Sequence, residues 1–414
     1  MWIGFDDTDS RDGGCTTYVC FEFVSRLYEK GYYLCEYPRL VRLNPQVPWK
    51  TRGNGAVAVH VGRGGEDKTM FAKRGDKEFF IDPDASTGTV DEEEIQRILQ
   101  AVLDEFAELD AEETNPGLVV SSTGFSASLY EQAVHDLVSM DKAVSFVDRE
   151  NGSYTIWKNG RGVIGAAAAI SWDSCRDHTY EIIAYRKQEN WKTPRKVDDE
   201  SVKKMDELFP STFDNYDYHN EYNSIVPHSP CPILFGIRGD KAPVLSKCLE
   251  QVKSETGQGW MIFLSNQGTD DHIRKKMIDE VNAFQSVRIK GIVASVPSRK
   301  KGGHILFSLN DSSGSLIDCM AYEPTKEFRD IIETLVIGDS IEVYGGIRDE
   351  PLAVNIEKIH VWEVMMVSEK IENPVCPSCG KHMKSKGKGQ GFFCKMCRTR
   401  SLDAIVEQKK RSIS

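Results

Sequence analysis

Three carboxylates near the amino terminus are the side chains best suited to chemistry. Asp6, Asp7 and Asp9 directly follow an apolar stretch that predicts a strand over residues 1–5, and a glycine-rich loop then leads into a predicted helix over residues 15–30. Strand ends in open α/β layers are where ligands gather, and helix N-termini attract phosphate. Clustered carboxylates repel one another unless a cation lies between them, and Mg²⁺ is the expected cation.

The same loop holds a pair of threonines. Thr16 and Thr17 stand at the predicted start of the helix, after Gly13 and Gly14. With a metal bridging triphosphate oxygens beside these hydroxyls, the loop would be a phosphoryl-transfer centre. The alternative is structural: residues 7–9 form a turn and Thr16 caps the helix. The residues of the loop alone leave both interpretations open.

Two further glycine-flanked segments are expected to complete a phosphate-binding pocket. Glycine allows close backbone approach to a ligand, and arginine clamps phosphate. Plain hairpin turns are an equal alternative for both segments. The candidate residues are Arg52, Gly53, Asn54 and Gly55 in the first segment and Arg161 in the second. Neither GxxxxGK[ST] nor GxSxG occurs in the chain, which excludes the familiar ATPase and hydrolase templates.

Four cysteines near the C-terminus form the most specific motif. Cys376 and Cys379, then Cys394 and Cys397, make two CxxC pairs separated by fourteen residues. Such pairs present four thiolates to one Zn²⁺ at about 2.3 Å and leave no open position for water. The zinc is therefore expected to be structural, holding a ribbon too small to fold alone. Eleven cysteines in a chain without a secretory signal also favour reduced thiols or a metal site over disulfides.

Charge is distributed unevenly along the 414 residues. The formal net charge is −11, yet residues 370–414 hold eleven Lys and Arg against three Asp and Glu. The tail is therefore +8 and the body is −19. A basic appendage on an acidic body predicts that the tail meets phosphates, although charge runs are often only solvated faces. The tail also holds two adjacent aromatic residues, Phe392 and Phe393, that would offer ring faces to bases.

Hydrophobic periodicity predicts a multidomain α+β protein. Strands alternate with helices up to about residue 190, and the clearest helix, over residues 91–109, has Thr89 and Glu92 as a possible capping box. Residues 191–222 are rich in Pro, Asp, Asn and Tyr and are expected to be an ordered connection.

Two further domains follow this connection. A strand, a helix and a strand are predicted over residues 232–239, 244–254 and 260–265, a βαβ unit that suits a small ferredoxin-like domain. From residue 286 to about 364, five strands with one helix after the third have the arrangement of an OB-fold barrel. OB-folds often bind oligonucleotides, an inference that rests on analogy of fold.

The sequence shows no membrane span and no secretory signal. The longest nearly uncharged apolar stretch, residues 162–172, is far shorter than the ~20 residues that cross a bilayer. The first ten residues hold three carboxylates where a signal needs a basic flank and an apolar run. We therefore expect a cytoplasmic protein with no membrane partner.

Motifs spread over essentially the full chain resemble the archaeal agmatidine synthetase family, also called 2-agmatinylcytidine synthetases. In chain order they are GFDDTDSRDGGCTTY, GNGAVAVHV, GRGVIGAAAAISW, DHTYEIIAYR, FGIRGD, SNQGTDDH, AYEPTKEFR and the four-cysteine ribbon. The resemblance implies a tRNA-cytidine kinase-like catalytic domain over residues 1–190, a ferredoxin-like domain over 191–285, an OB-fold nucleic-acid-binding domain over 286–368 and a zinc ribbon over 369–414.

The resemblance also implies an activity. It is that of an ATP-dependent carbon–nitrogen ligase that phosphorylates the C2 oxygen of the wobble cytidine in the AUA-reading isoleucine tRNA with a CAU anticodon. Agmatine then replaces that oxygen, and ATP is cleaved to AMP and phosphate. The implied cofactors are ATP, Mg²⁺ and structural Zn²⁺.

The resemblance assigns roles to residues of the first loop, and the residue pattern adds further candidates. The autophosphorylated threonine of the family corresponds to Thr16, with Thr17 one position on as the alternative. Asp6, Asp7 and Asp9 inherit the catalytic and ATP/Mg²⁺-binding role. The other residues expected to bind ATP and Mg²⁺ are Gly13, Gly14, Thr17, Arg52, Gly53, Asn54, Gly55 and Arg161. Those expected to contact tRNA are Arg299, Lys300, Lys301, Lys381, Lys384, Lys386 and Lys388.

A rival hypothesis is a non-catalytic protein that binds tRNA or single-stranded nucleic acid through its OB-fold and ribbon. The first loop discriminates between the two, because a pure binder has no use for three carboxylates that repel phosphate.

Overall fold

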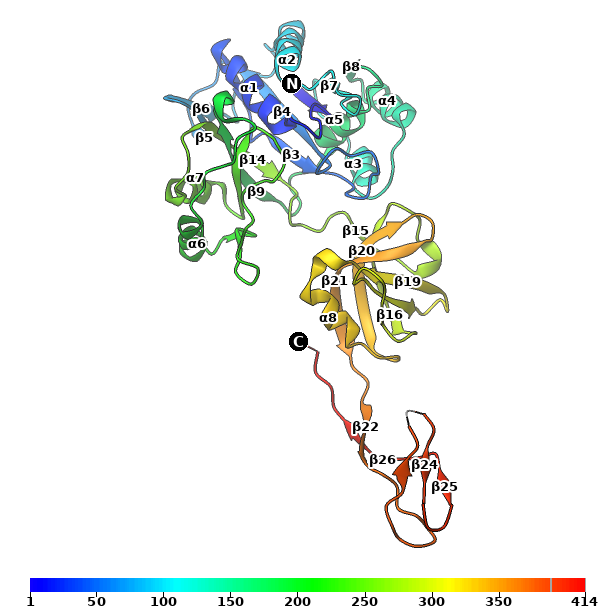
Figure 1. The fold of residues 1–414 in the computed structure, drawn as a ribbon. Helices are drawn as coiled ribbons and strands as arrows, with labels where there is room; N and C mark the ends of the chain where they lie inside the picture. The colour runs from blue at the N-terminus through cyan, green and yellow to red at the C-terminus, as the bar shows by residue number, and fades with distance from the viewer. Residues whose placement is uncertain (388, 414) are drawn as a thin grey trace. The chain divides into compact units, whose positions relative to one another are not determined.

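The structure, a computed structural model, describes residues 1–387 and 389–413. They fall into two compact units, shown in Figure 1. Unit 1 comprises Met1–Arg274 and Phe284–Ser286, and unit 2 comprises Lys275–Ala283 and Val287–Ser414.

A twelve-stranded sheet forms the centre of unit 1, in the order β10-β13-β9-β14-β5-β6-β2-β4-β1-β7-β8, with β3 beside β14 and β4. Its strand β1 (Trp2–Asp6) pairs antiparallel with β4 (Gly55–Arg63) and β7 (Gly117–Ser121). The other strands are β2 (Tyr32–Leu34), β3 (Arg39–Arg42), β5 (Thr69–Arg74), β6 (Lys77–Ile81), β8 (Ser153–Ile156), β9 (Thr179–Arg186), β10 (Thr212–Phe213), β13 (Ile233–Gly239) and β14 (Gly257–Ser265). A separate two-stranded ribbon joins β11 (Tyr216–Asp217) and β12 (Tyr222–Asn223).

Helices cover both faces of this sheet around β1 (Figure 1). Alternate side chains of a strand point to opposite faces, so Ile3 and Phe5 join the core of α1 (Thr16–Glu29) and α2 (Glu92–Phe106). Trp2 joins the core on the other face, which is built by α3 (Ser128–Ala133), α4 (Met140–Arg149) and α5 (Gly162–Ser171). The helix α5 packs directly on β1, because a Cβ added at Gly4 would lie 2.3 Å from Ala166 O.

The predicted strand and helices at the start of the chain are confirmed as β1, α1 and α2. The predicted capping box of α2 is wrong. Asp91 is the N-cap, and its side chain accepts a hydrogen bond from the backbone N–H of Glu94 at 3.1 Å. The chain therefore enters the helix two residues beyond Thr89, and the Asp91 carboxylate satisfies the free amide of Glu94.

The last part of unit 1 corrects the expected connection over residues 191–222. This segment contains the helix α6 (Asp199–Leu208), which packs with α7 (Ala242–Gln251) on β9, β13 and β14. Only Ser201, Val202 and Met205 of α6 are buried, so its apolar pattern is too sparse to find from periodicity. The predicted strand, helix and strand are confirmed as β13, α7 and β14, and β9 lies between the two strands.

Unit 2 contains the predicted OB-fold barrel. Its strands follow the closed order β16-β20-β21-β19-β18, and a pairing between β16 and β18 completes the barrel. A helix follows the third strand as predicted, and β19 runs parallel to β21. The elements are β16 (Ser286–Val293), β17 (Ser298–Arg299), β18 (Ile305–Asn310), β19 (Leu316–Ala321), α8 (Glu327–Glu333), β20 (Ser340–Arg348) and β21 (Ala353–Glu363).

A small ribbon follows the barrel in unit 2. The strands β22 (Val367–Glu372) and β26 (Ile405–Lys409) pair antiparallel on either side of it. Between them lies a three-stranded sheet of β23 (Lys384–Ser385), β24 (Phe392–Phe393) and β25 (Arg400–Ser401). The remaining short elements are η1 (Gln188–Asn190), β15 (Ile273–Lys275), η2 (Ile278–Glu280) and η3 (Glu323–Thr325).

Candidate active site

The loop after β1 lines a pocket of unit 1 together with segments far apart in the sequence. These include the start of α1, the connection between β3 and β4, the turn after α3, the first turn of α5 and the segment before β13. The predicted residues that line it are Asp6, Asp7, Asp9, Thr16, Thr17, Arg52, Gly53, Asn54, Gly55 and Arg161. The structure thus brings the three predicted segments together in one place.

Asp6 ends β1 directly beneath α5. A Cβ at Gly165 would lie 1.9 Å from Asp6 Oδ2, so this position must be glycine for the helix to pass over the carboxyl group. Burial raises the pKa of Asp6 well above its usual range, and the neighbouring charge of Asp7 raises it further. Its surroundings therefore disfavour the charged form of this carboxyl group.

Asp7 has a backbone φ of +60°, a conformation that few residues other than glycine adopt. Its Oδ2 accepts a hydrogen bond from Arg161 Nη2 at 3.1 Å. Burial raises the pKa of Asp7 to about 6, although the Arg161 guanidinium opposes the shift. Strained backbone of this kind is retained where the surroundings demand it, most often at functional sites.

Asp9 is held by the connection between β3 and β4. Arg52 Nε donates to Asp9 Oδ2 at 2.8 Å, and Thr51 Oγ1 donates to Asp9 Oδ1 at 3.1 Å. Arg52 also donates to Gly14 O at 2.6 Å and to Ser229 Oγ at 3.4 Å. One guanidinium group thereby joins the first loop, its own loop and the segment before β13.

Gly13 and Gly14 do not line the pocket, in contrast to the other predicted residues. Gly14 has a φ of +70°, and its carbonyl group is turned toward Arg52. Their position shapes the loop through the backbone, which is a role that glycine is suited to fill.

Thr16 and Thr17 both reach the pocket from the first turn of α1. Thr8 Oγ1 donates to Thr16 Oγ1 at 3.1 Å, and Thr17 Oγ1 lies 3.1 Å from Cys15 Sγ. Cys15 is the N-cap residue, and its side chain makes no capping hydrogen bond. The helix start therefore keeps amide donors that suit a phosphate oxygen, and the alternative in which Thr16 caps the helix is wrong.

The sequence did not identify Glu181 as a pocket residue. This side chain of β9 lines the pocket, is only 5% exposed and lies 3.4 Å from Arg42 and 3.6 Å from Arg238. The one sequence signal for it is an acidic residue within the mostly apolar segment TYEIIAYR. Other lining residues that were not predicted include Trp49, Lys50, Asp136, Ser229 and Cys231.

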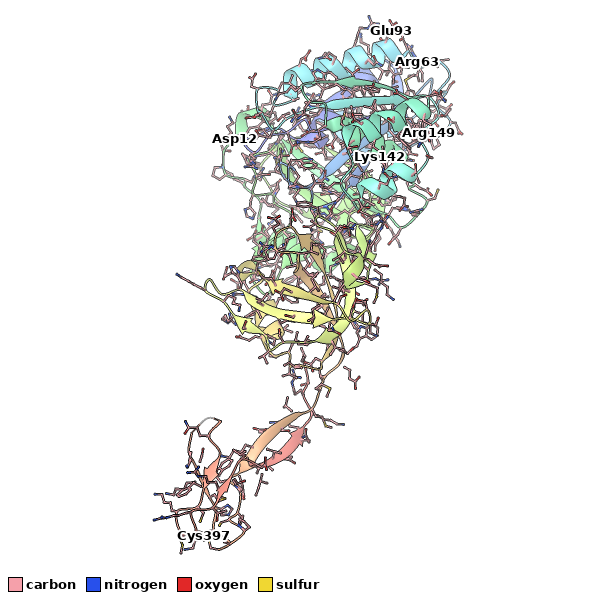
Figure 2. The ribbon with its side chains drawn as sticks, turned by 90° about the vertical axis from the view of Figure 1, so that its right-hand side faces the viewer. Asp12, Arg63, Glu93, Lys142, Arg149 and Cys397 are labelled. Atoms are coloured by element: carbon pink, nitrogen blue, oxygen red, sulfur yellow. The ribbon has the colours of Figure 1, made fainter. Side chains whose placement is uncertain are left out.

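The four cysteines of the ribbon meet as predicted. Their Sγ atoms all lie within 4.8 Å of one another, and Cys397 is labelled in Figure 2. Four thiolates around one Zn²⁺ at about 2.3 Å would stand about 3.8 Å apart, so the donor set fits a closed zinc site. Within residues 1–387 and 389–413, this is the one group of three or more potential ligands arranged to hold a metal ion.

The basic residues expected to contact tRNA lie in unit 2. Arg299 forms ion pairs with Asp330 at 2.8 Å and with Glu333 at 2.5 Å, which reduces the charge it offers to a phosphate. Lys386 Nζ lies 5.0 Å from the ring centre of Phe393. Lys388 lies outside the described residues. The remaining exposed candidates are Lys300, Lys301, Lys381 and Lys384.

The fold and the site define a multidomain α+β protein with a polar, carboxylate-bearing pocket, an OB-fold and a four-cysteine ribbon. Family profiles match along the chain: the TiaS TCKD domain at residues 2–157, the TiaS FLD domain at 160–272, an OB-fold nucleic acid binding domain at 287–362 and the TiaS C-terminal zinc ribbon domain at 373–413. The chain belongs to the TiaS family of isoleucine-tRNA 2-agmatinylcytidine synthetases.

Individual relatives agree with this assignment. The isoleucine-tRNA 2-agmatinylcytidine synthetase TiaS of Methanocaldococcus jannaschii is 41% identical over 96% of this chain and 89% of its own length. That of Archaeoglobus fulgidus is 38% identical over 100% of this chain and 92% of its own.

Solved structures agree as well. A complex of TiaS with isoleucine tRNA and ATP matches with a TM-score of 0.83 at 36% identity. A complex of TiaS with isoleucine tRNA, AMPCPP and agmatine matches with a TM-score of 0.80 at 34% identity. Each covers 100% of this chain and 92% of the solved chain.

Among the described residues, no helix is both long and apolar enough to cross a membrane.

Asp7→Asn is expected to stabilise the protein at neutral pH in the absence of nucleotide and metal. The folded-state pKa of Asp7, about 6 against 3.8 in the unfolded chain, means that ionisation opposes folding increasingly from pH 3.8 to 6 and fully above pH 6. At about 1.4 kcal/mol per pKa unit the gain approaches ~3 kcal/mol at pH 7.5 and shrinks as the pH falls toward 5. Urea unfolding in EDTA at pH 5, 6, 7 and 8 measures it.

The matched control is Asp12→Asn, because Asp12 is exposed on the same loop (Figure 2). It should change the free energy of unfolding little at any of these pH values. An equal effect of Asp7→Asn at pH 5 and pH 8 would contradict the assigned cause.

Proposed function

We propose that the protein is an ATP-dependent ligase that converts the wobble cytidine of an AUA-reading isoleucine tRNA with a CAU anticodon to 2-agmatinylcytidine. One observation of the structure supports it above all. The partly buried carboxylates at and after the end of β1, the threonines of α1 and the arginines of two distant segments converge in a single pocket. The relatives that match over nearly the whole chain are isoleucine-tRNA 2-agmatinylcytidine synthetases.

The chemistry requires an activated base. The C2 oxygen of cytosine is a poor leaving group, so an amine displaces it only after phosphorylation has turned it into phosphate. ATP gives up two phosphoryl groups and ends as AMP: one goes to the C2 oxygen, and the other goes to the hydroxyl oxygen of Thr16, from which water releases it as phosphate. The primary amine of agmatine, having lost a proton, then forms the new bond to C2 while the C–O bond breaks and phosphate leaves.

The residues of the first loop supply the electrostatics of the phosphoryl transfer. Asp6, Asp7 and Asp9 would hold Mg²⁺, whose charge offsets that of the phosphate oxygens. The raised pKa values of Asp6 and Asp7 fit such a role, because buried carboxyl groups regain their charge beside a cation. Arg161 would release Asp7, bind a phosphate oxygen in its place and so stabilise the phosphoryl group during transfer.

The other residues that line the pocket are also proposed to bind the nucleotide. Arg52 is anchored on Asp9, which leaves the glycines beside it to approach the triphosphate closely. Thr16 is proposed as the residue that becomes phosphorylated, and Thr17 lies beside it in the first turn of α1. Gly13 and Gly14 act indirectly, by shaping the loop. The residues placed around ATP are Thr17, Gly53, Asn54, Gly55 and Arg161.

The first unit would combine a kinase-like and a ferredoxin-like domain. The arrangement of β13, α7 and β14 around β9 supports the second of these. The divisions 1–190, 191–285, 286–368 and 369–414 stay predictions, and β9 pairs with strands on the far side of residue 190. Since tRNA is the substrate, the cytoplasm is the proposed place of action.

A non-catalytic RNA-binding protein is the second candidate function. The OB-fold favours it, but its phosphate partner would be repelled by the carboxylates of the first loop. The two functions therefore differ in whether the tRNA leaves the protein chemically changed.

The decisive experiment is mass analysis of nucleosides after incubation of the protein with ATP, Mg²⁺, agmatine and the CAU-anticodon isoleucine tRNA. The wild-type protein is expected to yield 2-agmatinylcytidine, and Asp6→Asn to yield less than about a hundredth as much, because loss of a charge ligand typically removes several kcal/mol from transition-state stabilisation. Asp12→Asn, on the same loop, should retain activity. An unchanged tRNA with the wild-type protein would favour the non-catalytic function.

Thr16→Val is expected to abolish the transfer of label from γ-labelled ATP to the protein, while Thr17→Val retains it. Both side chains are 6% exposed and sit in the same turn, so the two variants are a matched pair. Valine replaces the hydroxyl group by a methyl group of similar volume. Label that persists in the double variant would show that neither threonine is the acceptor.

The ribbon is proposed to strengthen tRNA binding through its lysines. Replacing residues 374–403 by a short Gly-Ser turn keeps β22 and β26 and the ion pair of Arg411 with Asp339 at 2.9 Å. We expect affinity for tRNA to fall at least about tenfold, with a weaker salt dependence because fewer counterions are released. Self-phosphorylation should be unchanged. If the variant and the wild-type protein bind tRNA equally well, at about 50 mM and also at about 200 mM salt, the ribbon does not have this role.

A further inference from the structure

Trp49 is the one aromatic side chain among the residues that line the candidate active site. Its side chain is 44% exposed, although tryptophan is usually well covered in proteins. Within the described part of the chain, Trp362 of the OB-fold is the only other exposed tryptophan. A large exposed ring at a pocket that acts on nucleobases calls for a physical explanation.

The loop that carries Trp49 is held on both sides. Leu43 N donates to Asn54 O, and Asn54 Nδ2 donates to Asn44 O, both at 2.9 Å. Two and three residues beyond the tryptophan, Thr51 and Arg52 bind Asp9. The ring therefore projects from a closed loop whose base is fixed to the carboxylates, so its position relative to the first loop is defined.

The ring lies beside a cation of the reaction centre. The guanidinium carbon of Arg161 is 6.0 Å from the ring centre of Trp49, and Arg161 also donates to Asp7. Trp49 and Asp7 thus contact the same arginine. A planar base stacked on the indole ring would have its edge near Arg161, which is proposed to bind phosphate.

Apolar side chains line the pocket near this loop. Val47 precedes the tryptophan, and Leu137 and Val138 follow α3. Asn44 N donates to Ala133 O at 2.9 Å, which brings the end of α3 to the same loop. Leu137 is itself 39% exposed. The pocket therefore offers apolar cover on this side and carboxylates and hydroxyl groups on the other.

We propose that Trp49 is the stacking platform that receives the target cytosine after it is drawn out of the tRNA anticodon loop. This inference rests on the proposed function. An extruded base loses its stacking neighbours, and an aromatic side chain restores that contact for any base. Cytosine is chosen over the adenine of ATP because the ring is exposed to solvent, where a macromolecular substrate enters.

The test is a double-mutant cycle between Trp49 and the wobble base. Two tRNAs are compared, the natural one and one that lacks the base of the wobble nucleotide, with the wild-type protein and with Trp49→Leu. Wild-type protein is expected to bind the tRNA without the base about 5- to 100-fold more weakly, the range that one base–aromatic stack supplies. Trp49→Leu should bind both tRNAs equally, at the weaker level.

Conservative and remote variants supply the controls. Trp49→Phe should retain most of the difference between the two tRNAs, because a smaller ring still stacks. Trp362→Leu is the matched control, since its ring lies in unit 2 against Lys290 Nζ at 4.3 Å. It should leave the ratio of the two affinities unchanged.

Two outcomes would overturn the proposal. If Trp49→Leu raises the KM for ATP and leaves the tRNA ratio intact, the ring holds adenine. If the two tRNAs differ by the same factor in Trp49→Leu and in the wild type, the ring does not contact the base. Either result leaves formation of 2-agmatinylcytidine by the wild-type protein untouched, so failure of this inference and failure of the proposed function are distinguishable.

Discussion

Two adjacent, partly buried carboxylates at the end of a strand are the constraint on which this site depends. Asp6 and Asp7 oppose folding when charged, because burial disfavours the ionised form. The surrounding structure holds them regardless: β1 pairs on both edges, and α5 packs against its face. The resulting demand for positive charge is met in part by Arg161, whose Nη2 lies 3.1 Å from Asp7 Oδ2.

The close packing of α5 against Asp6 explains the glycine at position 165. At Gly165 the helix α5 passes so close to Asp6 that no side chain fits. A side chain at this position would have to displace either the helix or the carboxyl group of Asp6. The small residues of GVIGAAAAIS therefore serve the electrostatics of the site as well as the packing of the helix.

Much of the fold and part of the candidate site can be predicted from short sequence motifs. The apolar strand followed by DDTD predicts β1 and its loop, the five strands and one helix predict the OB-fold, and the cysteine spacing predicts a group of four sulfur atoms. Contacts between residues far apart in the sequence cannot be predicted from such motifs. The bond from Arg52 to Asp9 joins residues 43 apart, and Glu181 reaches the pocket because β9 inserts between β13 and β14. Helix α6 was missed because few of its residues are buried.

The arrangement also separates two demands that conflict. Phosphoryl transfer needs carboxylates and a bound cation, whereas affinity for tRNA needs exposed positive charge. In the body of the chain acidic residues outnumber basic ones by 19, while the tail is positive by 8. If the cations of the ribbon lay beside Asp6 and Asp7, they would neutralise the carboxylates and compete with the metal. The carboxylates belong to unit 1 and the basic residues of the ribbon belong to unit 2, so different parts of the chain meet the two demands, and distributed phosphate contacts can offset the cost of drawing out one base.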